Sequence, residues 1–152
     1  MPVHYDFKKD LPIARKTETE ISELLCKTYN LKYYSGCNDN RWDLDLTNKS
    51  GKHFTFEVKE DFTHARTGNI GVEFFCREKP SGISVSKADY YVYKLHEKDG
   101  SFHVYIIKTS VFKKMIDAEM YDRTIDGGDK GSHSLNYLFI DTVFYQYAKK
   151  IV

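Results

Sequence analysis

The chain has 152 residues, a length that typically forms one compact domain, and we expect residues 1–152 to form a single domain. Apolar residues make up 41% of it and aromatic residues 15%, enough to bury a core, which excludes a disordered or collagen-like protein. The 23 basic and 22 acidic residues leave a net charge of +1, which by itself favours no polyanionic partner.

The sequence also bears on the compartment in which the protein works. It has no apolar run near the roughly 18 residues of a membrane span, and its first residues lack the apolar stretch of a signal peptide. Its three cysteines, Cys26, Cys37 and Cys76, form no close pair and are predicted to stay reduced. We therefore expect a cytoplasmic protein, in a host cell if the chain is viral, with no membrane partner.

The N-terminal part is predicted to form one helix and a short strand. Ile21 and Leu25 recur at helical spacing within residues 13–29, while charged residues fall on the other side of the helix. Residues 31–35 are predicted to form a strand, and the polar residues 36–40 that follow favour a turn.

Two alternating strands, over residues 41–46 and 53–60, give the clearest pattern in the sequence. A turn at residues 48–52 joins them and predicts a hairpin. Each strand places apolar side chains on one face: Trp42, Leu44 and Leu46 on the first strand, then Phe54, Phe56 and Val58 on the second. The opposite face is predicted to carry polar side chains, namely Asp43, Asp45, Thr55, Glu57 and Lys59.

Turn residues and periodicity predict the remaining elements. We expect a polar loop at 61–69, a strand at 70–76, a turn at 77–82, a short helix at 84–88, a hairpin of strands 90–95 and 102–108, a helix from Thr109 or Ser110 to about Met120, a loop at 124–134, a strand at 135–140 and a helix at 142–150. Together these elements predict an α/β (α+β) fold with a mixed central β-sheet flanked by helices.

The acidic face of the hairpin favours a metal site. Crowded carboxylates repel one another, and removing them from water raises their pKa values, so they need a partner. Mg²⁺ or Mn²⁺ would fit, because hard cations take oxygen ligands from one or two carboxylates. Asp43 or Asp45 together with Glu57 would supply these oxygens. Lys59 follows on the same face, where an ammonium group can stabilise charge on a phosphate.

This hairpin resembles the signature of the PD-(D/E)XK nuclease superfamily, an Asp on one strand and Glu-x-Lys on the next. Here the matching residues are Asp43 and Glu57-Val58-Lys59. The first helix resembles that of the Holliday-junction resolvases in Glu18-Thr19-Glu20-Ile21, and segments 67–73, 80–83 and 87–90 resemble phage-type members. An exposed acidic hairpin without metal is the other interpretation of the same carboxylates.

The resemblance implies a restriction-endonuclease-like core and a metal-dependent endonuclease that hydrolyses DNA phosphodiester bonds, in branched DNA or in phage DNA processing. It implies Mg²⁺ or Mn²⁺ as cofactor. The implied catalytic residues are Asp43, Glu57, Lys59 and Glu18, and the implied metal ligands are Asp43, Glu57, the Val58 carbonyl group and Asp45. Of the two aspartates, Asp43 is favoured as the main ligand. Glu18 has two possible roles: it orients the site, or it is a solvated carboxylate in the first turn of its helix.

Basic residues around the hairpin are candidates for contacts with DNA phosphates, although each also fits an ordinary solvated loop. They are His64, Arg66, Arg77, Lys79 and Lys87. A homodimer would suit paired cuts at a junction. A catalytically inactive nucleic-acid-binding or protein-interaction module on the same fold is the alternative function, which the near-neutral net charge slightly favours.

Overall fold

The computed structural model describes residues 7–36, 42–127 and 133–152, with side chains described from residue 15 onward. The elements follow one another as α1 (Phe7–Tyr29), β1 (Lys32–Gly36), β2 (Leu44–Thr47), β3 (His53–Asp61), α2 (His64–Thr67), β4 (Asn69–Cys76), β5 (Lys79–Pro80), the 3-10 helix η1 (Gly82–Ser84), β6 (Tyr90–His96), β7 (Phe102–Lys108), α3 (Thr109–Asp117), β8 (Arg123–Gly127), β9 (Ser134–Ile140), α4 (Asp141–Tyr147) and β10 (Lys149–Lys150).

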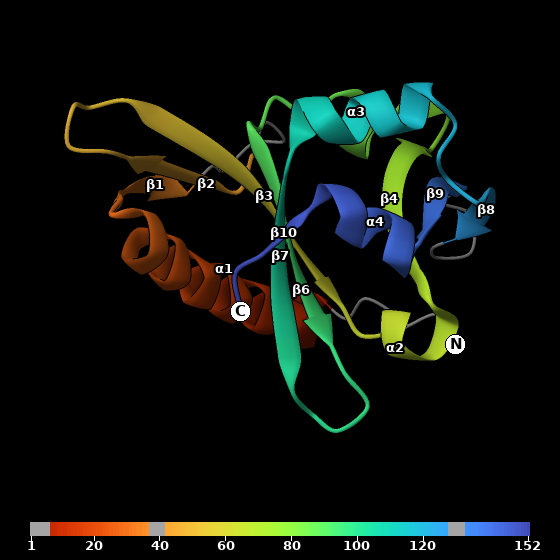
Figure 1. The fold of residues 1–152 in the computed structure, drawn as a ribbon, viewed down its shortest axis with the longest axis horizontal. Helices are drawn as coiled ribbons and strands as arrows, with labels where there is room; N and C mark the ends of the chain where they lie inside the picture. The colour runs from red at the N-terminus through yellow and green to blue at the C-terminus, as the bar shows by residue number, and fades with distance from the viewer. Residues whose placement is uncertain (1–6, 37–41, 128–132) are drawn as a thin grey trace.

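A six-stranded mixed sheet lies at the centre, with the strand order β1-β2-β3-β6-β7-β10 (Figure 1). Strands β3 and β6 run parallel, while the other neighbouring pairs are antiparallel. Parallel neighbours need a crossover connection rather than a tight turn. Here the crossover contains α2, β4, β5 and η1, so the chain leaves the central sheet directly after β3.

A second, antiparallel sheet is formed by the strands β5-β4-β9-β8. The sequence predicted one central sheet, because alternation shows which residues are strand-like but not which strands pair. Strand β4 instead pairs with β9, from Asn69 opposite Ile140 to Phe75 opposite Leu135. Ile70 and Phe139 of this pair are fully buried against the central sheet, which explains the separate layer.

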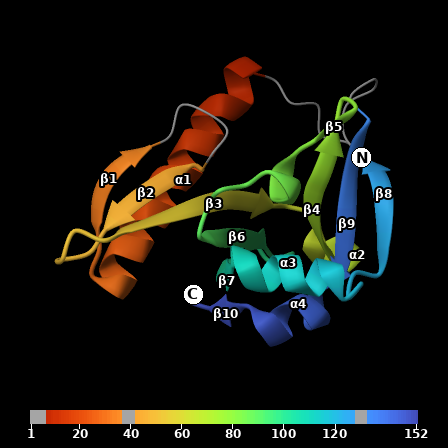
Figure 2. The same ribbon diagram turned by 90° about the horizontal axis from the view of Figure 1, so that it is seen from above.

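Helices flank the central sheet, as predicted. Helix α1 buries Ile21 and Leu25 against Leu44, Leu46 and Phe56 on one face. Helices α3 and α4 lie on the other side of the sheet from α1 (Figure 2), where their aromatic side chains pack on Tyr91 and Tyr93. Among the described helices, none is both long and apolar enough to cross a membrane.

Several boundaries differ from the predicted ones. Helix α1 begins at Phe7 rather than at 13, and β2 begins at Leu44, so Trp42 and Asp43 precede the strand. Position 41, the predicted first residue of that strand, lies outside the described residues, as do Cys37 and most of the turn at 36–40. The helix expected at 84–88 is the short η1 at Gly82–Ser84.

The C-terminal predictions also need correction. The first part of the loop expected at 124–134 is strand β8, which pairs with β9, while residues 128–132 lie outside the described ranges. The last helix ends at Tyr147, and Lys149–Lys150 forms β10 against β7. Strand β10 owes its conformation to a distant partner strand, β7, which local sequence preference does not reveal, whereas β8 pairs with β9, the next strand along the chain.

Gly82 fixes how η1 meets β4. Its φ is +51°, and a Cβ atom added there would lie 2.0 Å from the carbonyl oxygen of Glu73. We predict that Gly82→Ala lowers the free energy of unfolding by about 2–4 kcal/mol, since it adds a backbone clash to the strain of a positive φ.

Urea unfolding measures this change, and Gly51→Ala is the matched control. Gly51 also has a positive φ, +84°, but open space surrounds its Cβ position. Gly51→Ala should lower the free energy of unfolding by only about 1 kcal/mol. Equal losses for the two variants would contradict the close approach of Gly82 to β4.

Candidate active site

Asp43 is held against strand β3 by two hydrogen bonds. Its backbone N–H donates to the Phe56 carbonyl oxygen at 2.9 Å, which extends the β2–β3 pairing by one residue. Its side-chain Oδ2 accepts a hydrogen bond of 2.7 Å from the backbone N–H of Val58. The carboxylate is therefore anchored beside the residue between these two, Glu57.

Glu57 is half-buried, and its carboxyl group lies close enough to that of Asp43 for the two to repel each other. Burial, followed by the negative charge of Asp43, raises the pKa of Glu57 to about 7, although the charge of Lys59 opposes the rise. Near neutral pH the Glu57 carboxyl group therefore keeps its proton part of the time. This is the electrostatic condition that a divalent cation would relieve.

Glu18 of α1 belongs to the same cluster. Burial raises the pKa of its carboxyl group, and the negative charge of Asp43 adds to the rise, while Arg15 opposes it. Glu20, two residues further along the helix, instead forms an ion pair with the Lys94 ammonium group, at 2.8 Å. The helix thus turns Glu18, rather than Glu20, toward the candidate site.

Asp45 lies away from this cluster. It is 7% exposed, pairs opposite Thr55 in the β2–β3 ladder, and its Oδ1 is 2.8 Å from Nδ1 of His53. The spacing leaves Asp43 and Asp45 open as partners for Glu57, since both are expected on one strand face, and the family resemblance favours Asp43. The geometry brings Asp43 to Glu57, and Asp45 serves the hairpin end through His53.

A cleft of about 480 Å³ opens over these groups, between the central sheet and the second sheet. Its lining includes Asp43, Glu57 and Lys59 on one side. Two of the basic residues expected at phosphates also line it, Arg77 from the β4–β5 turn and Lys79 from the start of β5. The cleft therefore combines two crowded carboxylates with three cationic side chains.

Sequence reasoning missed two residues that line this cleft. Glu73 is not among the predicted site residues, but its Oε2 accepts a 3.0 Å hydrogen bond from Ser81 and its Oε1 accepts one from Ser134, which ties β4 to η1 and β9. Trp42 was assigned to the apolar face with Leu44, but it precedes β2 and lines the cleft. Nothing in the alternation pattern distinguishes the two placements of Trp42.

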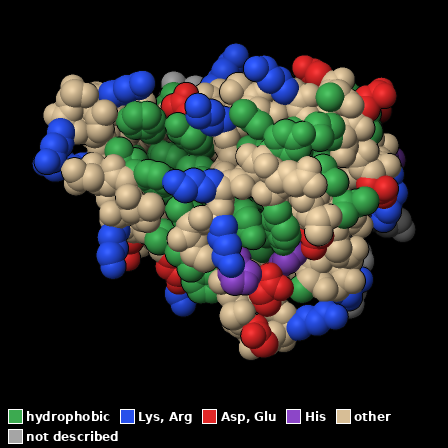
Figure 3. Space-filling model, viewed as in Figure 1, with side chains coloured by type: hydrophobic (Ala, Val, Ile, Leu, Met, Phe, Trp, Pro, Cys, Tyr) green, Lys and Arg blue, Asp and Glu red, His purple; other side chains and the backbone are tan. Residues whose placement is uncertain are grey.

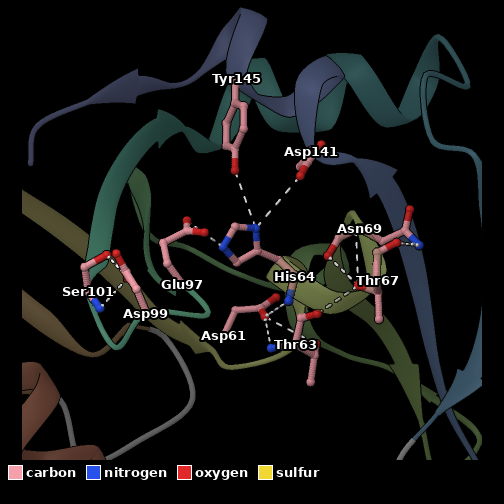
Figure 4. Close-up of polar contacts among 10 residues, drawn as sticks. All are labelled: Asp61, Thr63, His64, Thr67, Asn69, Glu97, Asp99, Ser101, Asp141 and Tyr145. Carbon is pink, nitrogen blue, oxygen red and sulfur yellow. Dashed lines mark hydrogen bonds and ion pairs between the residues drawn. The ribbon is translucent and has the colours of Figure 1, made fainter.

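The other predicted phosphate contacts lie outside the cleft lining. Arg66 on α2 and Lys87 after η1 are both exposed. His64 is only 3% exposed, with Nε2 3.0 Å from Oε1 of Glu97 and Nδ1 3.5 Å from the Tyr145 hydroxyl (Figure 4). A ring enclosed in this way has no surface for a phosphate, so the expected role of His64 is corrected to one of joining α2 to neighbouring elements.

The residues present fit a hard divalent cation. Among the described residues, no group of three or more His, Cys, Asp and Glu side chains is arranged as a preformed metal site. Mg²⁺, however, usually takes one or two carboxylates and completes its shell with water and substrate phosphate. The crowded oxygens of Asp43 and Glu57 match that donor set. Val58, the expected carbonyl ligand, is not among the cleft-lining residues, and its N–H instead orients Asp43.

Comparison with protein-family models and with curated protein sequences found no match. The functional conclusion therefore depends on the arrangement of side chains in the cleft.

The raised pKa of Glu57 predicts how stability depends on pH. The folded protein holds the Glu57 proton up to pH about 7, whereas the unfolded chain releases it near the ordinary glutamate pKa of 4.5. Stability from this group is therefore complete below about pH 4.5 and is lost as pH rises through 7. Without metal, Glu57→Gln should gain on the order of 1–3 kcal/mol over wild type between pH 4.5 and 8.

Urea unfolding in the presence of a chelator, across this pH range, measures the difference between the two proteins. Asp43→Asn is the matched comparison, because it removes the negative charge that is the second cause of the shift and should shrink the pH-dependent loss. If the difference in free energy of unfolding between wild type and Glu57→Gln stays constant with pH, the pKa of Glu57 is not raised and its carboxyl group is not crowded.

Proposed function

We propose that the protein is a metal-dependent endonuclease that hydrolyses DNA phosphodiester bonds, with a PD-(D/E)XK-type site on a restriction-endonuclease-like core. One observation supports this above the others: Asp43 is anchored against Glu57, with Lys59 on the same strand, in one open cleft. Paired carboxylates and a lysine around a space that can admit a phosphate are suited to phosphoryl hydrolysis better than to a structural role.

In this proposal Asp43 and Glu57 hold Mg²⁺ or Mn²⁺. The bound cation would supply a Lewis acid for the phosphate and lower the pKa of a water molecule. The Val58 N–H keeps Asp43 in one orientation, so its carboxylate is preorganised for the ion. Lys59 stabilises the negative charge that develops on the phosphate oxygens. Glu18 completes the acidic environment from α1 and acts as a positioning residue.

DNA is the proposed substrate because basic side chains, which could contact its phosphates, gather in this one cleft. The chain as a whole carries a net charge of only +1, but Lys59, Arg77 and Lys79 line one cleft. Arg77 in the β4–β5 turn and Lys79 at the start of β5 are both exposed, so they can follow a phosphate backbone on either side of the scissile bond. Preference for branched DNA and action as a homodimer are further parts of the proposal.

The proposal predicts Mg²⁺- or Mn²⁺-dependent cleavage of at least one of three substrates: branched, duplex or single-stranded DNA. Glu57→Gln and Lys59→Ala should each reduce the cleavage rate by at least about 100-fold, because each removes a charge needed in the transition state. Lys98→Ala is the matched control, an exposed lysine on the β6–β7 turn outside the cleft lining, and should keep the wild-type rate.

Equal activity of wild type, Glu57→Gln and Lys59→Ala would refute this site assignment. DNA binding without cleavage, unchanged in Glu57→Gln, would instead support the inactive binding module. Purified protein and gel-resolved DNA fragments are sufficient to separate these outcomes.

A further inference from the structure

An apolar recess of about 650 Å³ lies on the face of the central sheet opposite Glu57. Phe54 and Phe56 of β3 point into it, whereas the alternate residues of the strand face the carboxylate cleft. Figure 3 shows it as a hollowed green surface with blue lysine or arginine side chains at its rim. The end of α1, strand β7 and the α4–β10 segment enclose its sides. Helix α1 therefore covers only part of this sheet face.

The recess has the properties of a small-molecule site. Its volume falls in the range of about 300–1,000 Å³ that is typical for ligand pockets. Aromatic and aliphatic side chains form most of the lining, chiefly Tyr29, Phe54, Phe56, Tyr90, Ile106 and Tyr147. Tyr29 and Tyr147 remain 36% and 46% exposed, so apolar surface is open to solvent at the mouth. An apolar ligand would remove this surface from water.

The charged groups of the recess are both cationic. Lys108 and Lys149 line it, and no Asp or Glu of the described residues does so. Neither lysine forms an ion pair with a described carboxylate, and the Lys149 ammonium lies 5.8 Å from the centre of the Tyr29 ring. Asp89 lies in the adjoining hollow, where its Oδ2 accepts hydrogen bonds from the backbone and hydroxyl of Thr55.

We propose that this recess binds an alkyl carboxylate, with its hydrocarbon chain among the aromatic side chains and its carboxylate at Lys108 and Lys149. Charge complementarity selects an anion, and the apolar lining selects a hydrocarbon body. A nucleobase fits less well, because the hydrogen-bonding groups on its edges would lie unpaired against aliphatic and aromatic surface. The site is separate from the proposed nuclease cleft, so the two proposals stand or fall independently.

Calorimetric titration with decanoate, below its micelle concentration, tests the proposal. Wild-type protein should bind one decanoate saturably, and 1-decanol, which has the same chain without charge, should bind about tenfold more weakly. The double variant Lys108→Met/Lys149→Met should lose about tenfold in decanoate affinity, and Val111→Trp, which fills the recess from α3, should abolish binding. Lys98→Met is the matched control and should bind like wild type.

Thermal unfolding of each variant confirms that it is folded before titration. The double lysine variant replaces only exposed side chains, so it keeps the test decisive even if Val111→Trp does not fold. Absence of saturable binding to wild type would overturn the proposal, as would equal affinities for decanoate and 1-decanol or an unchanged affinity in the double variant. Light scattering tests whether a second copy of the chain fills the recess instead. A dimer that decanoate does not dissociate, and that Val111→Trp prevents from forming, would assign the recess to that second copy and overturn the proposal.

Discussion

The hydrogen bond from the Val58 N–H to the Asp43 carboxylate is the contact on which the candidate site depends. It anchors an acidic side chain that precedes β2 onto the neighbouring strand, directly beside Glu57. The result is electrostatically unfavourable, since burial and the charge of Asp43 raise the pKa of Glu57 to about 7. A fold that places two carboxylates in this position gives up stability, and such arrangements are common where a site binds a cation or transfers protons.

The parallel pairing of β3 with β6 then determines what surrounds the carboxylates. Because these strands are parallel, the chain must leave the sheet between them, and it uses that excursion to build β4, β5 and η1. This excursion brings Arg77 and Lys79 to the cleft, while Glu73 ties the wall together through Ser81 and Ser134. The turn itself has positive φ at both Arg77 and Glu78, 50° and 62°, a conformation suited to joining two antiparallel strands tightly.

Local patterns were sufficient to predict the β2–β3 hairpin, the shared face of Glu57 and Lys59, and the β6–β7 hairpin, because period-two alternation reflects burial of one sheet face. They were insufficient where distant contacts decide the outcome. Strand β10 and the separate second sheet arise from pairing with remote segments, β10 with β7 and β4 with β9. His64 looked like a loop cation, but Glu97 and Tyr145 enclose it from elements far along the chain. Trp42 was misplaced because β2 begins only at Leu44.

Calorimetric titration of the metal-free protein with Mn²⁺ at pH 8 tests most directly whether the two anchored carboxylates form a cation site. The account predicts saturable binding to wild type, a loss of more than about tenfold in affinity for Asp43→Asn and for Glu57→Gln, and retained binding for Asp45→Asn, whose carboxylate faces His53. Absence of binding to wild type, or equal affinities for wild type and Glu57→Gln, would contradict it.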